Sequence, residues 1–336
     1  MMLVEARSAP TVVKGQRADE ALYLALADKL RASPPSGIVT IARGSSDHAA
    51  GYLAYLVTAR TGQLVTSLPM SIVTLYHAPL KARNVLAIAV SQSGSSPDLV
   101  EPIRAVRSGG GTTVALLNVE ASPLGEAAEW AIPLRAGPEK AVAATKSFIA
   151  SLAAEARLVA HWCEIPELVE ALPSLPSALE DALEKDWSHG VEVLSPAERL
   201  MVISRGLGLP VAQEAALKFK EMCGIQAEAF SAAEARHGPQ ALIGEGYPLL
   251  IFAVRGPAQA DLVALADEMR VRKATVLLAA PADVPSRDLT LATTGSQDLD
   301  PIAAIASFYP MVEAVTRARG MDPDQHPYLS KVTTTR

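Results

Sequence analysis

A cluster of serines follows a short apolar segment in the first half of the chain, in a pattern suited to phosphate binding. Residues 85–90 form an apolar run of strand length, which ends at Ser91-Gln-Ser-Gly-Ser-Ser96. Pro97 and an acidic, periodic segment come next, which indicates the first turn of a helix. Hydroxyl groups beside the unpaired N–H groups of a helix N-terminus form a donor set that favours an anion. One serine would be enough to cap the helix, so we favour a phosphate site over simple capping.

A second group of ionisable residues lies in the second half of the chain. Residues 213–221 predict a helix, in which Glu214, Lys218 and Glu221 lie four and three positions apart and therefore share a face. For an arbitrary helix, an exposed ion pair between Lys218 and Glu221 would be the favoured interpretation. His237 precedes a Gly-Pro pair and is expected in a loop, where a buried structural histidine is less common than on an apolar face.

An alternation of strands and helices is expected to position these residues. Such an alternation predicts an open parallel sheet with helices on both faces, whose ligands bind beyond the carboxyl ends of the strands. The serine segment and the turn Arg43-Gly-Ser-Ser46 both follow predicted strands. We expect strands at residues 38–42, 63–67, 85–90, 113–118 and 130–134, and helices at 16–32 and 49–61. The segment 139–146 is expected to open a further, alanine-rich helix that runs to about residue 163.

The second half of the chain repeats the first. Ile38-Val-Thr-Ile-Ala-Arg-Gly-Ser45 aligns with Leu200-Met-Val-Ile-Ser-Arg-Gly-Leu207, and Asp98-Leu-Val aligns with Asp261-Leu-Val at nearly the same offset. This indicates an internal duplication of one α/β unit. At the strand end that corresponds to the serine segment, the second copy has Arg255-Gly-Pro-Ala-Gln, so we expect only the first copy to bind phosphate.

The composition argues against several classes of function. The chain has 336 residues, enough for two domains, and its 49% hydrophobic and 20% charged residues are typical of a globular protein. A net charge of −6 without a basic block argues against nucleic acid and anionic membranes as partners. The start of the chain lacks the apolar core of a signal peptide, and no segment approaches the ~20 apolar residues of a membrane helix. The two cysteines fit a reducing compartment. We expect a cytoplasmic protein, and because the six histidines lack metal-binding spacing, we expect no metal and no cofactor.

Taken together, the motifs resemble those of proteins with two tandem sugar isomerase (SIS) domains. The resemblance is specifically to the isomerase half of glucosamine-6-phosphate synthase and to the second type of glucosamine-6-phosphate deaminase. It extends from about residue 36 to Arg336. It rests on the order of these motifs: Arg43-Gly-Ser-Ser46, Ser91-Gln-Ser-Gly94, Gly137-Pro-Glu-Lys-Ala-Val-Ala-Ala-Thr-Lys146, Glu214-Ala-Ala-Leu-Lys-Phe-Lys-Glu221, His237-Gly-Pro239 and Leu329-Ser-Lys-Val-Thr333.

The resemblance implies an α/β fold with two tandem SIS domains. Each domain is expected to be a parallel five-stranded sheet flanked by helices, in a flavodoxin-like three-layer sandwich. Several prolines mark the connection between the two halves. The expected boundaries are an N-terminal helical segment at 1–35, a phosphate-binding SIS domain at 36–165, a linker at 166–190, a second SIS domain at 191–320, and a tail at 321–336 that closes the active site.

The resemblance also implies which residues bind the substrate, a small-molecule sugar phosphate. Arg43 and Ala144 depart from the synthase, which has cysteine and serine at these positions. The residues that match phosphate and sugar contacts are Ser45, Ser46, Ser91, Gln92, Ser93, Ser96, Val142 and Ser330.

Four further residues match catalytic positions of the family. Glu221 matches the general base that moves a proton between C1 and C2, which a partly desolvated carboxylate can do. His237 matches the residue that opens the sugar ring, reached from the neighbouring subunit of a homodimer. Lys218 matches a lysine near the sugar hydroxyls, and Lys331 matches the tail lysine that closes over the open-chain sugar.

The choice of reaction depends on the start of the chain. The synthase carries an N-terminal glutaminase domain with a cysteine after its first methionine, whereas Met2-Leu3 stands here, so we expect no ammonia-generating domain. The leading hypothesis is therefore a glucosamine-6-phosphate deaminase, which forms fructose 6-phosphate and ammonia. The alternatives are an isomerase or deaminase of galactosamine 6-phosphate or fructosamine 6-phosphate, an ammonia-dependent isomerase that forms glucosamine 6-phosphate, and a phosphosugar-sensing SIS regulator. A regulator would need a DNA-binding segment, which the residues before the first strand are too few to form.

Overall fold

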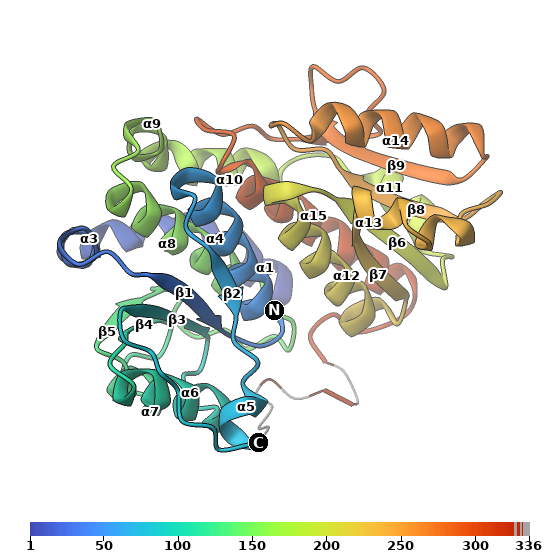
Figure 1. The fold of residues 1–336 in the computed structure, drawn as a ribbon. Coiled ribbons are helices and arrows are strands. Elements are labelled where there is room, and N and C mark those ends of the chain that lie inside the picture. Colours follow the sequence, from blue (N-terminus) through green and yellow to red (C-terminus); the bar gives the residue numbers. More distant parts are fainter. Residues whose placement is uncertain (326–327, 330, 332–336) are drawn as a thin grey trace. The chain divides into compact units, whose positions relative to one another are not determined.

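The computed structural model describes residues 1–325, 328–329 and 331, and the chain divides into two compact units. The first-sheet unit comprises residues 11–139 and 146–170 together with Lys331. The second-sheet unit comprises residues 1–10, 140–145, 171–325 and 328–329. Each unit contains one five-stranded sheet (Figure 1).

The first-sheet unit is an open parallel sheet with helices on both faces. Its strands are β1 (Gly37–Ile41), β2 (Val65–Ser67), β3 (Val85–Ser91), β4 (Thr112–Leu117) and β5 (Trp130–Pro133), in the spatial order β2-β1-β3-β4-β5. Successive strand residues point to opposite faces, so Ala87 and Ala89 of β3 meet Leu99 and Ile103 in one hydrophobic cluster. One face packs on α6 (Pro97–Ser108) and α7 (Pro123–Ala127), and the other is covered by α3 (Glu20–Ala32), α4 (Ser45–Thr61) and α8 (Lys146–Trp162) (Figure 1).

The second-sheet unit has the same layered construction. Its strands are β6 (Arg199–Ser204), β7 (Gln226–Ser231), β8 (Pro248–Phe252), β9 (Thr275–Pro281) and β10 (Leu289–Leu291), in the order β10-β9-β8-β6-β7 and all parallel. Phe219 and Phe308 pack edge to face with ring centroids 5.2 Å apart, which joins the two helices of one face. The helices of that face are α12 (Leu209–Cys223) and α15 (Asp300–Ala318), and those of the other are α13 (Ala232–Arg236) and α14 (Gln259–Val271) (Figure 1).

The two sheets share one topology. Counted from its own first strand, each sheet has the spatial order 2-1-3-4-5. This order and the parallel pairing confirm the predicted α/β class with two five-stranded parallel sheets, and they agree with a duplicated α/β unit. In this order the chain continues from the first strand to one side of the sheet and from the third strand to the other side. Ligands of doubly wound sheets bind between these two strands, at their carboxyl ends.

The helix after β1 begins earlier than the sequence predicted. It was expected from residue 49, but α4 starts at Ser45, because Gly44 adopts a left-handed φ of +56° and turns the chain directly into the helix. Ser45 and Ser46 therefore lie in the first helical turn rather than in a preceding loop.

The segments at 1–35 and 166–190 are largely helical. The expected helix at 16–32 is divided, since residues up to 19 form a 3-10 turn in which the buried Gln16 side chain donates to the carbonyls of Leu134 and Ala150. Nowhere in the described residues does a helix have the length and apolarity needed to cross a bilayer. The remaining helices are α1 (Met2–Arg7), α2 (Ala9–Gly15), η1 (Gln16–Asp19), α5 (Ser71–Thr74), α9 (Pro166–Ala171), η2 (Leu172–Ser174), α10 (Leu175–Leu183), α11 (Ser188–Leu194), η3 (Gly206–Gly208) and η4 (Pro239–Leu242).

Candidate functional site

The serine segment forms a tight loop between β3 and α6. The Oγ atom of Ser91 accepts a hydrogen bond from the Gly94 N–H at 3.0 Å, and Ser95 donates its hydroxyl to Oγ of Ser93 at 3.0 Å. A hydroxyl that accepts a hydrogen bond keeps its own proton for another partner. The hydroxyls of Ser91 and Ser93 can therefore donate to a bound anion without breaking the loop.

Gly94 is required by this loop for two reasons. Its φ of +63° lies in the left-handed region, and a Cβ atom at this position would lie 2.2 Å from Oγ of Ser122. The loop also receives a hydrogen bond of 2.9 Å from the Leu124 N–H to the Gly94 carbonyl. The serine loop is therefore packed directly against the connection from β4 to α7.

Ser96 uses its hydroxyl differently from the other serines. It is the N-cap residue of α6, and its hydroxyl donates to Oδ1 of Asp98 at 2.7 Å. Asp98 is buried, and its Oδ2 atom accepts from Nε of Arg43 at 3.1 Å. Ser96 would have to release Asp98 before it could donate to a phosphate, so Ser91 and Ser93 are better prepared for that role.

The same ion pair occurs in both units. Arg205 and Asp261 of the second-sheet unit are joined at 3.1 Å between Nη1 and Oδ2, at the positions that align with Arg43 and Asp98. A contact that is present beside different loops is a feature of the duplicated scaffold. Arg43, which departs from the resembling synthase, thus has a partner in this scaffold.

Two helix N-termini meet the same edge of the first sheet. The helix α4 starts at Ser45 after β1, and α6 starts at Pro97 after β3, and these two strands are direct neighbours. Helix N-termini carry partial positive charge, so an anion at this edge is stabilised by both. The side chains of Ser45, Ser46 and Gln92 are half-buried at the same edge, which is compatible with their predicted roles.

The second-sheet unit differs at the corresponding strand end. Arg255 follows β8 and donates to both carboxylate oxygens of Asp300, at 2.6 and 2.8 Å, and to the Thr294 carbonyl. The charge of Arg255 is therefore matched within the unit, and its surroundings carry no set of hydroxyls like that of Ser91–Ser96.

The helix α12 carries a buried row of charges. The Nζ atom of Lys218 lies 3.3 Å from Oε1 of Glu214 and forms an ion pair with Oε2 of Glu221. The ion pair between Lys218 and Glu221 is present, but their side chains are 1% and 24% exposed, so it is not the exposed pair expected for an arbitrary helix. The side chain of Glu214 is 0% exposed. Their shared helix face was predicted correctly.

Only Glu221 of this row is open to solvent. Its side chain is 24% exposed, and it accepts a hydrogen bond from Lys218. Burial lowers the pKa of Lys218, but the charges and hydrogen bonds of Glu214 and Glu221 outweigh this effect and leave the pKa above its usual value. Lys218 is therefore an ammonium group, and it donates a hydrogen bond to Glu221.

The sequence predicted no function for Glu214 and placed it only on the same helix face as Lys218 and Glu221. The structure makes it the second carboxylate partner of Lys218, and its spacing of four residues was the signal that could have identified it.

His237 lies in the loop that was predicted for it. It ends α13 as the C-cap residue, its side chain is exposed, and its N–H donates to the Glu234 carbonyl. Gly238 follows with a φ of +136°, which turns the chain into η4. The imidazole of His237 is thus presented on the surface of its unit.

The tail and the 140–145 segment hold the remaining predicted residues. Lys331 donates to Oε2 of Glu139 at 2.9 Å within the first-sheet unit. Val142 is half-buried in a bend of the second-sheet unit, where Glu5 accepts from the N–H groups of Lys140 and Ala141. Ser330 lies outside the described residues.

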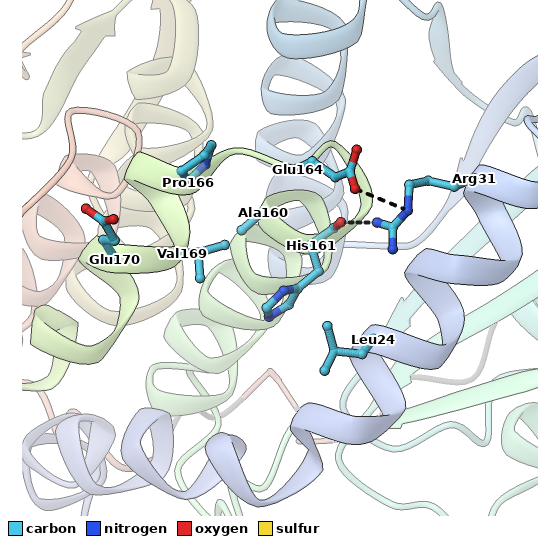
Figure 2. A pocket seen from close by; sticks show the side chains of 8 residues that line it. All are labelled: Leu24, Arg31, Ala160, His161, Glu164, Pro166, Val169 and Glu170. Carbon is cyan, nitrogen blue, oxygen red and sulfur yellow. Dashed lines mark hydrogen bonds and ion pairs between the residues drawn. The ribbon is translucent and has the colours of Figure 1, made fainter.

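A separate pocket lies beside the C-terminal end of α8 (Figure 2). It has a volume of about 340 Å³, and Arg31 crosses it to donate to the His161 carbonyl and to approach Glu164 at 3.9 Å. None of the predicted site residues lines it; the lining residues are Leu24, Arg31, Ala160, His161, Glu164, Pro166, Val169 and Glu170. Among the described residues, no group of three or more histidine, cysteine, aspartate or glutamate side chains is arranged to hold a metal ion.

Comparisons with known proteins identify the family of the chain. The family model described as the SIS domain matches residues 33–160 and 193–280. The glutamine–fructose-6-phosphate aminotransferases (isomerizing) of Zymomonas mobilis and Aeropyrum pernix are 31% and 33% identical to 88% of this chain. The chain spans about half the length of these relatives, 52% and 51% respectively.

Solved structures share the fold. A candidate phosphosugar isomerase from Silicibacter pomeroyi is 40% identical, with a TM-score of 0.91 over 96% of this chain and 99% of that chain. A glucosamine-6-phosphate deaminase from Thermotoga maritima has a TM-score of 0.74 over 98% of this chain and 100% of that chain, and its identity of 19% supports a common fold alone.

Proposed function

The chain belongs to the SIS domain family, and from this membership we propose that it interconverts the aldose and ketose forms of an amino-sugar phosphate. In the specific form of the proposal, glucosamine 6-phosphate and water give fructose 6-phosphate and ammonia. The observation that carries it is the row on α12, in which the buried ammonium of Lys218 holds the partly exposed carboxylate of Glu221.

The serine loop is proposed to hold the phosphate, which does not react. Ser91 and Ser93 keep hydroxyl protons for the anion, and Ser45, Ser46, Gln92 and Ser96 are proposed to complete the set. Binding energy from a non-reacting group is used to fix the reacting carbons against the base. The backbone at Val142 and Ser330 is proposed to contact the sugar.

The proposed chemistry begins when His237 assists opening of the sugar ring. Glu221 then removes the proton from C2 of the open-chain amino aldose and returns it to C1, while a second proton moves from the nitrogen to the C1 oxygen. The C1 aldehyde thereby becomes an alcohol and the C2 amine becomes an imine. Water adds to the imine carbon, and ammonia leaves to give the C2 ketone. Lys218 and Lys331 are proposed to stabilise the negative charge on the sugar oxygens during proton transfer.

The exposed position of His237 supports the proposal that it serves the site of a second copy of the chain in a homodimer. An exposed histidine on a short loop is accessible to a neighbouring subunit, and an imidazole can both donate and accept a proton.

The ammonia-releasing direction is proposed because it needs only the amino sugar and water. A second candidate is the reverse amination of fructose 6-phosphate, which the names of the relatives at 31–33% identity favour. The two candidates share the same residues and differ in the source of nitrogen.

Ammonia release from purified protein tests the proposal. We expect ammonia and fructose 6-phosphate from glucosamine 6-phosphate, and a loss of about a hundredfold or more in kcat for Glu221→Gln. Glu192→Gln, at an exposed position of α11, is the matched control and should keep full activity. Galactosamine 6-phosphate and fructosamine 6-phosphate are assayed in parallel.

The proposal is rejected if the folded protein releases no ammonia from any of these sugars, or if Glu221→Gln is as active as the unaltered chain. Synthesis of glucosamine 6-phosphate from fructose 6-phosphate and ammonium, without measurable release, would favour the second candidate.

A further inference from the structure

Lys331 in the C-terminal tail is bound to a buried carboxylate far from it in sequence. Its Nζ atom lies 2.9 Å from Oε2 of Glu139, and the two residues are separated by 192 positions. The side chain of Glu139 is 0% exposed and that of Lys331 is 23% exposed. An ion pair with one fully buried member is screened less by solvent than a surface pair.

Glu139 is fixed independently of the tail. Its Oε1 atom accepts from the Ser147 N–H at 3.1 Å, and its Oε2 atom accepts from the Ser147 hydroxyl at 2.7 Å. The ammonium of Lys146 donates to the neighbouring Pro138 carbonyl at 2.8 Å. Ser147 lies in the first turn of α8, where the helix dipole favours a carboxylate. Glu139 is therefore a rigid acceptor at the start of α8.

We propose that Glu139 is the positioning residue that holds the ammonium group of Lys331 in place for catalysis. This inference rests on the proposed function, in which Lys331 acts on the open-chain sugar. An ammonium group has three N–H donors, so one can be bound by Glu139 while the others serve oxygens of the sugar. A cation with a fixed position stabilises developing negative charge without first having to be oriented.

Capping of α8 is the alternative role of Glu139. The bonds to Ser147 would satisfy N-terminal groups of the helix whether or not Lys331 is bound. A capping role therefore predicts that a change at Glu139 lowers kcat/KM by the same factor with and without the Lys331 side chain. A positioning role predicts that the change at Glu139 has a smaller effect on kcat/KM once Lys331 is replaced.

Tryptic cleavage after Lys331 tests the contact without any measurement of activity. A lysine side chain bound to Glu139 is not free to enter the specificity pocket of trypsin. We expect Glu139→Gln to raise the cleavage rate after Lys331 about tenfold, relative to cleavage after the exposed Lys81 in the same digest. Glu126→Gln, at an exposed position of α7, is the charge-matched control and should leave the ratio unchanged. Equal ratios for Glu139→Gln and the unaltered chain would overturn the proposal.

A kinetic double-mutant cycle tests the catalytic part. We expect Glu139→Gln to lower kcat/KM about tenfold in the unaltered chain and less than about twofold in the Lys331→Ala background. Ser147→Ala, which leaves the charge of Glu139 in place, should have a smaller effect than Glu139→Gln. Equal fold-changes in the two backgrounds would assign Glu139 to the capping of α8. A chain that protects Lys331 from trypsin but releases no ammonia would overturn the proposed function and leave the contact established.

Discussion

Lys218 and Glu214 form a buried ion pair of 3.3 Å on one face of α12, with Glu221 as the solvent-facing end of the same row. Removing one member of a buried pair leaves an uncompensated charge, whereas the partly exposed Glu221 can be hydrated. The row therefore has a buried part, Glu214 and Lys218, and a part that is open to solvent, Glu221.

Lys218→Met should destabilise the protein far more than Glu221→Gln. The first change leaves Glu214 buried without its cation and is expected to cost about 3–5 kcal/mol, and the second should cost about 1 kcal/mol or less. Urea unfolding measures both values. The double variant Lys218→Met with Glu214→Gln is the control, because it removes both buried charges and should recover part of the loss. A Lys218→Met variant as stable as the unaltered chain would contradict the burial of the pair.

Gly94→Ala should disrupt the serine loop. The new Cβ atom would clash with Ser122 in addition to the strain of a left-handed backbone, and we expect a loss of about 2–4 kcal/mol. Gly62→Ala is the matched control, since Gly62 has a similar φ of +71° but no atom within 4 Å of a new Cβ, and it should cost about 1 kcal/mol.

The two glycine variants also separate phosphate binding from stability. Inorganic phosphate should raise the thermal midpoint of the unaltered chain and of Gly62→Ala but not of Gly94→Ala. An equal rise in all three proteins would show that the serine loop does not bind the anion.

Stability should fall with rising pH because of Glu155. This residue is fully buried in α8, neither of its carboxylate oxygens has a hydrogen-bond partner among the described residues, and burial raises its pKa well above the usual value. The folded state therefore keeps a proton that the unfolded chain loses above about pH 4.3, so the stabilising effect of this proton is complete below that pH and declines as the pH rises towards the folded pKa.

Glu155→Gln removes this dependence. We measure the free energy of unfolding in urea from pH 5 to pH 8. As the pH rises, this free energy for the variant should increase relative to that of the unaltered chain by up to about 1.4 kcal/mol per pH unit, which is the limit for one proton. The exposed Glu126→Gln should not alter the slope. Parallel stability curves for Glu155→Gln and the unaltered chain would show that Glu155 is charged in the folded state.

Glu5→Ala should weaken sugar binding although Glu5 lies outside the matched SIS segments. Its carboxylate accepts from the N–H groups of Lys140 at 2.6 Å and Ala141 at 3.2 Å, next to the proposed sugar contact at Val142. Loss of two charge-assisted hydrogen bonds is expected to raise KM about tenfold. Val4→Ala, on the exposed side of the same helix, is the control, and equal KM values for both variants would contradict the prediction.

Local patterns predicted the parts of the fold that local forces determine. The strand at Val85–Ser91 and the helix start at Pro97 follow from an apolar run and from helix capping, and both occur as expected. The shared face of Glu214, Lys218 and Glu221 follows from helical geometry alone.

Contacts between distant segments were not predictable in this way. The burial of Lys218 has no signal within α12 itself, and Glu5 reaches Lys140 across 135 positions. The hydroxyl of Ser96 is used by Asp98, which a count of serines does not reveal. The sequence therefore identified which residues could carry charge or donate hydrogen bonds, but not which of them are already engaged.

The ion pairs Arg43–Asp98 and Arg205–Asp261 mark what the two copies of the unit have kept in common. Each pair ties the turn after the first strand to the helix after the third, so the framework persists whatever segment lies beside it. At the strand end of the second-sheet unit that corresponds to the serine loop, Arg255 forms an ion pair with Asp300. Duplication has therefore preserved one framework in both units while the strand ends beside it have diverged in composition.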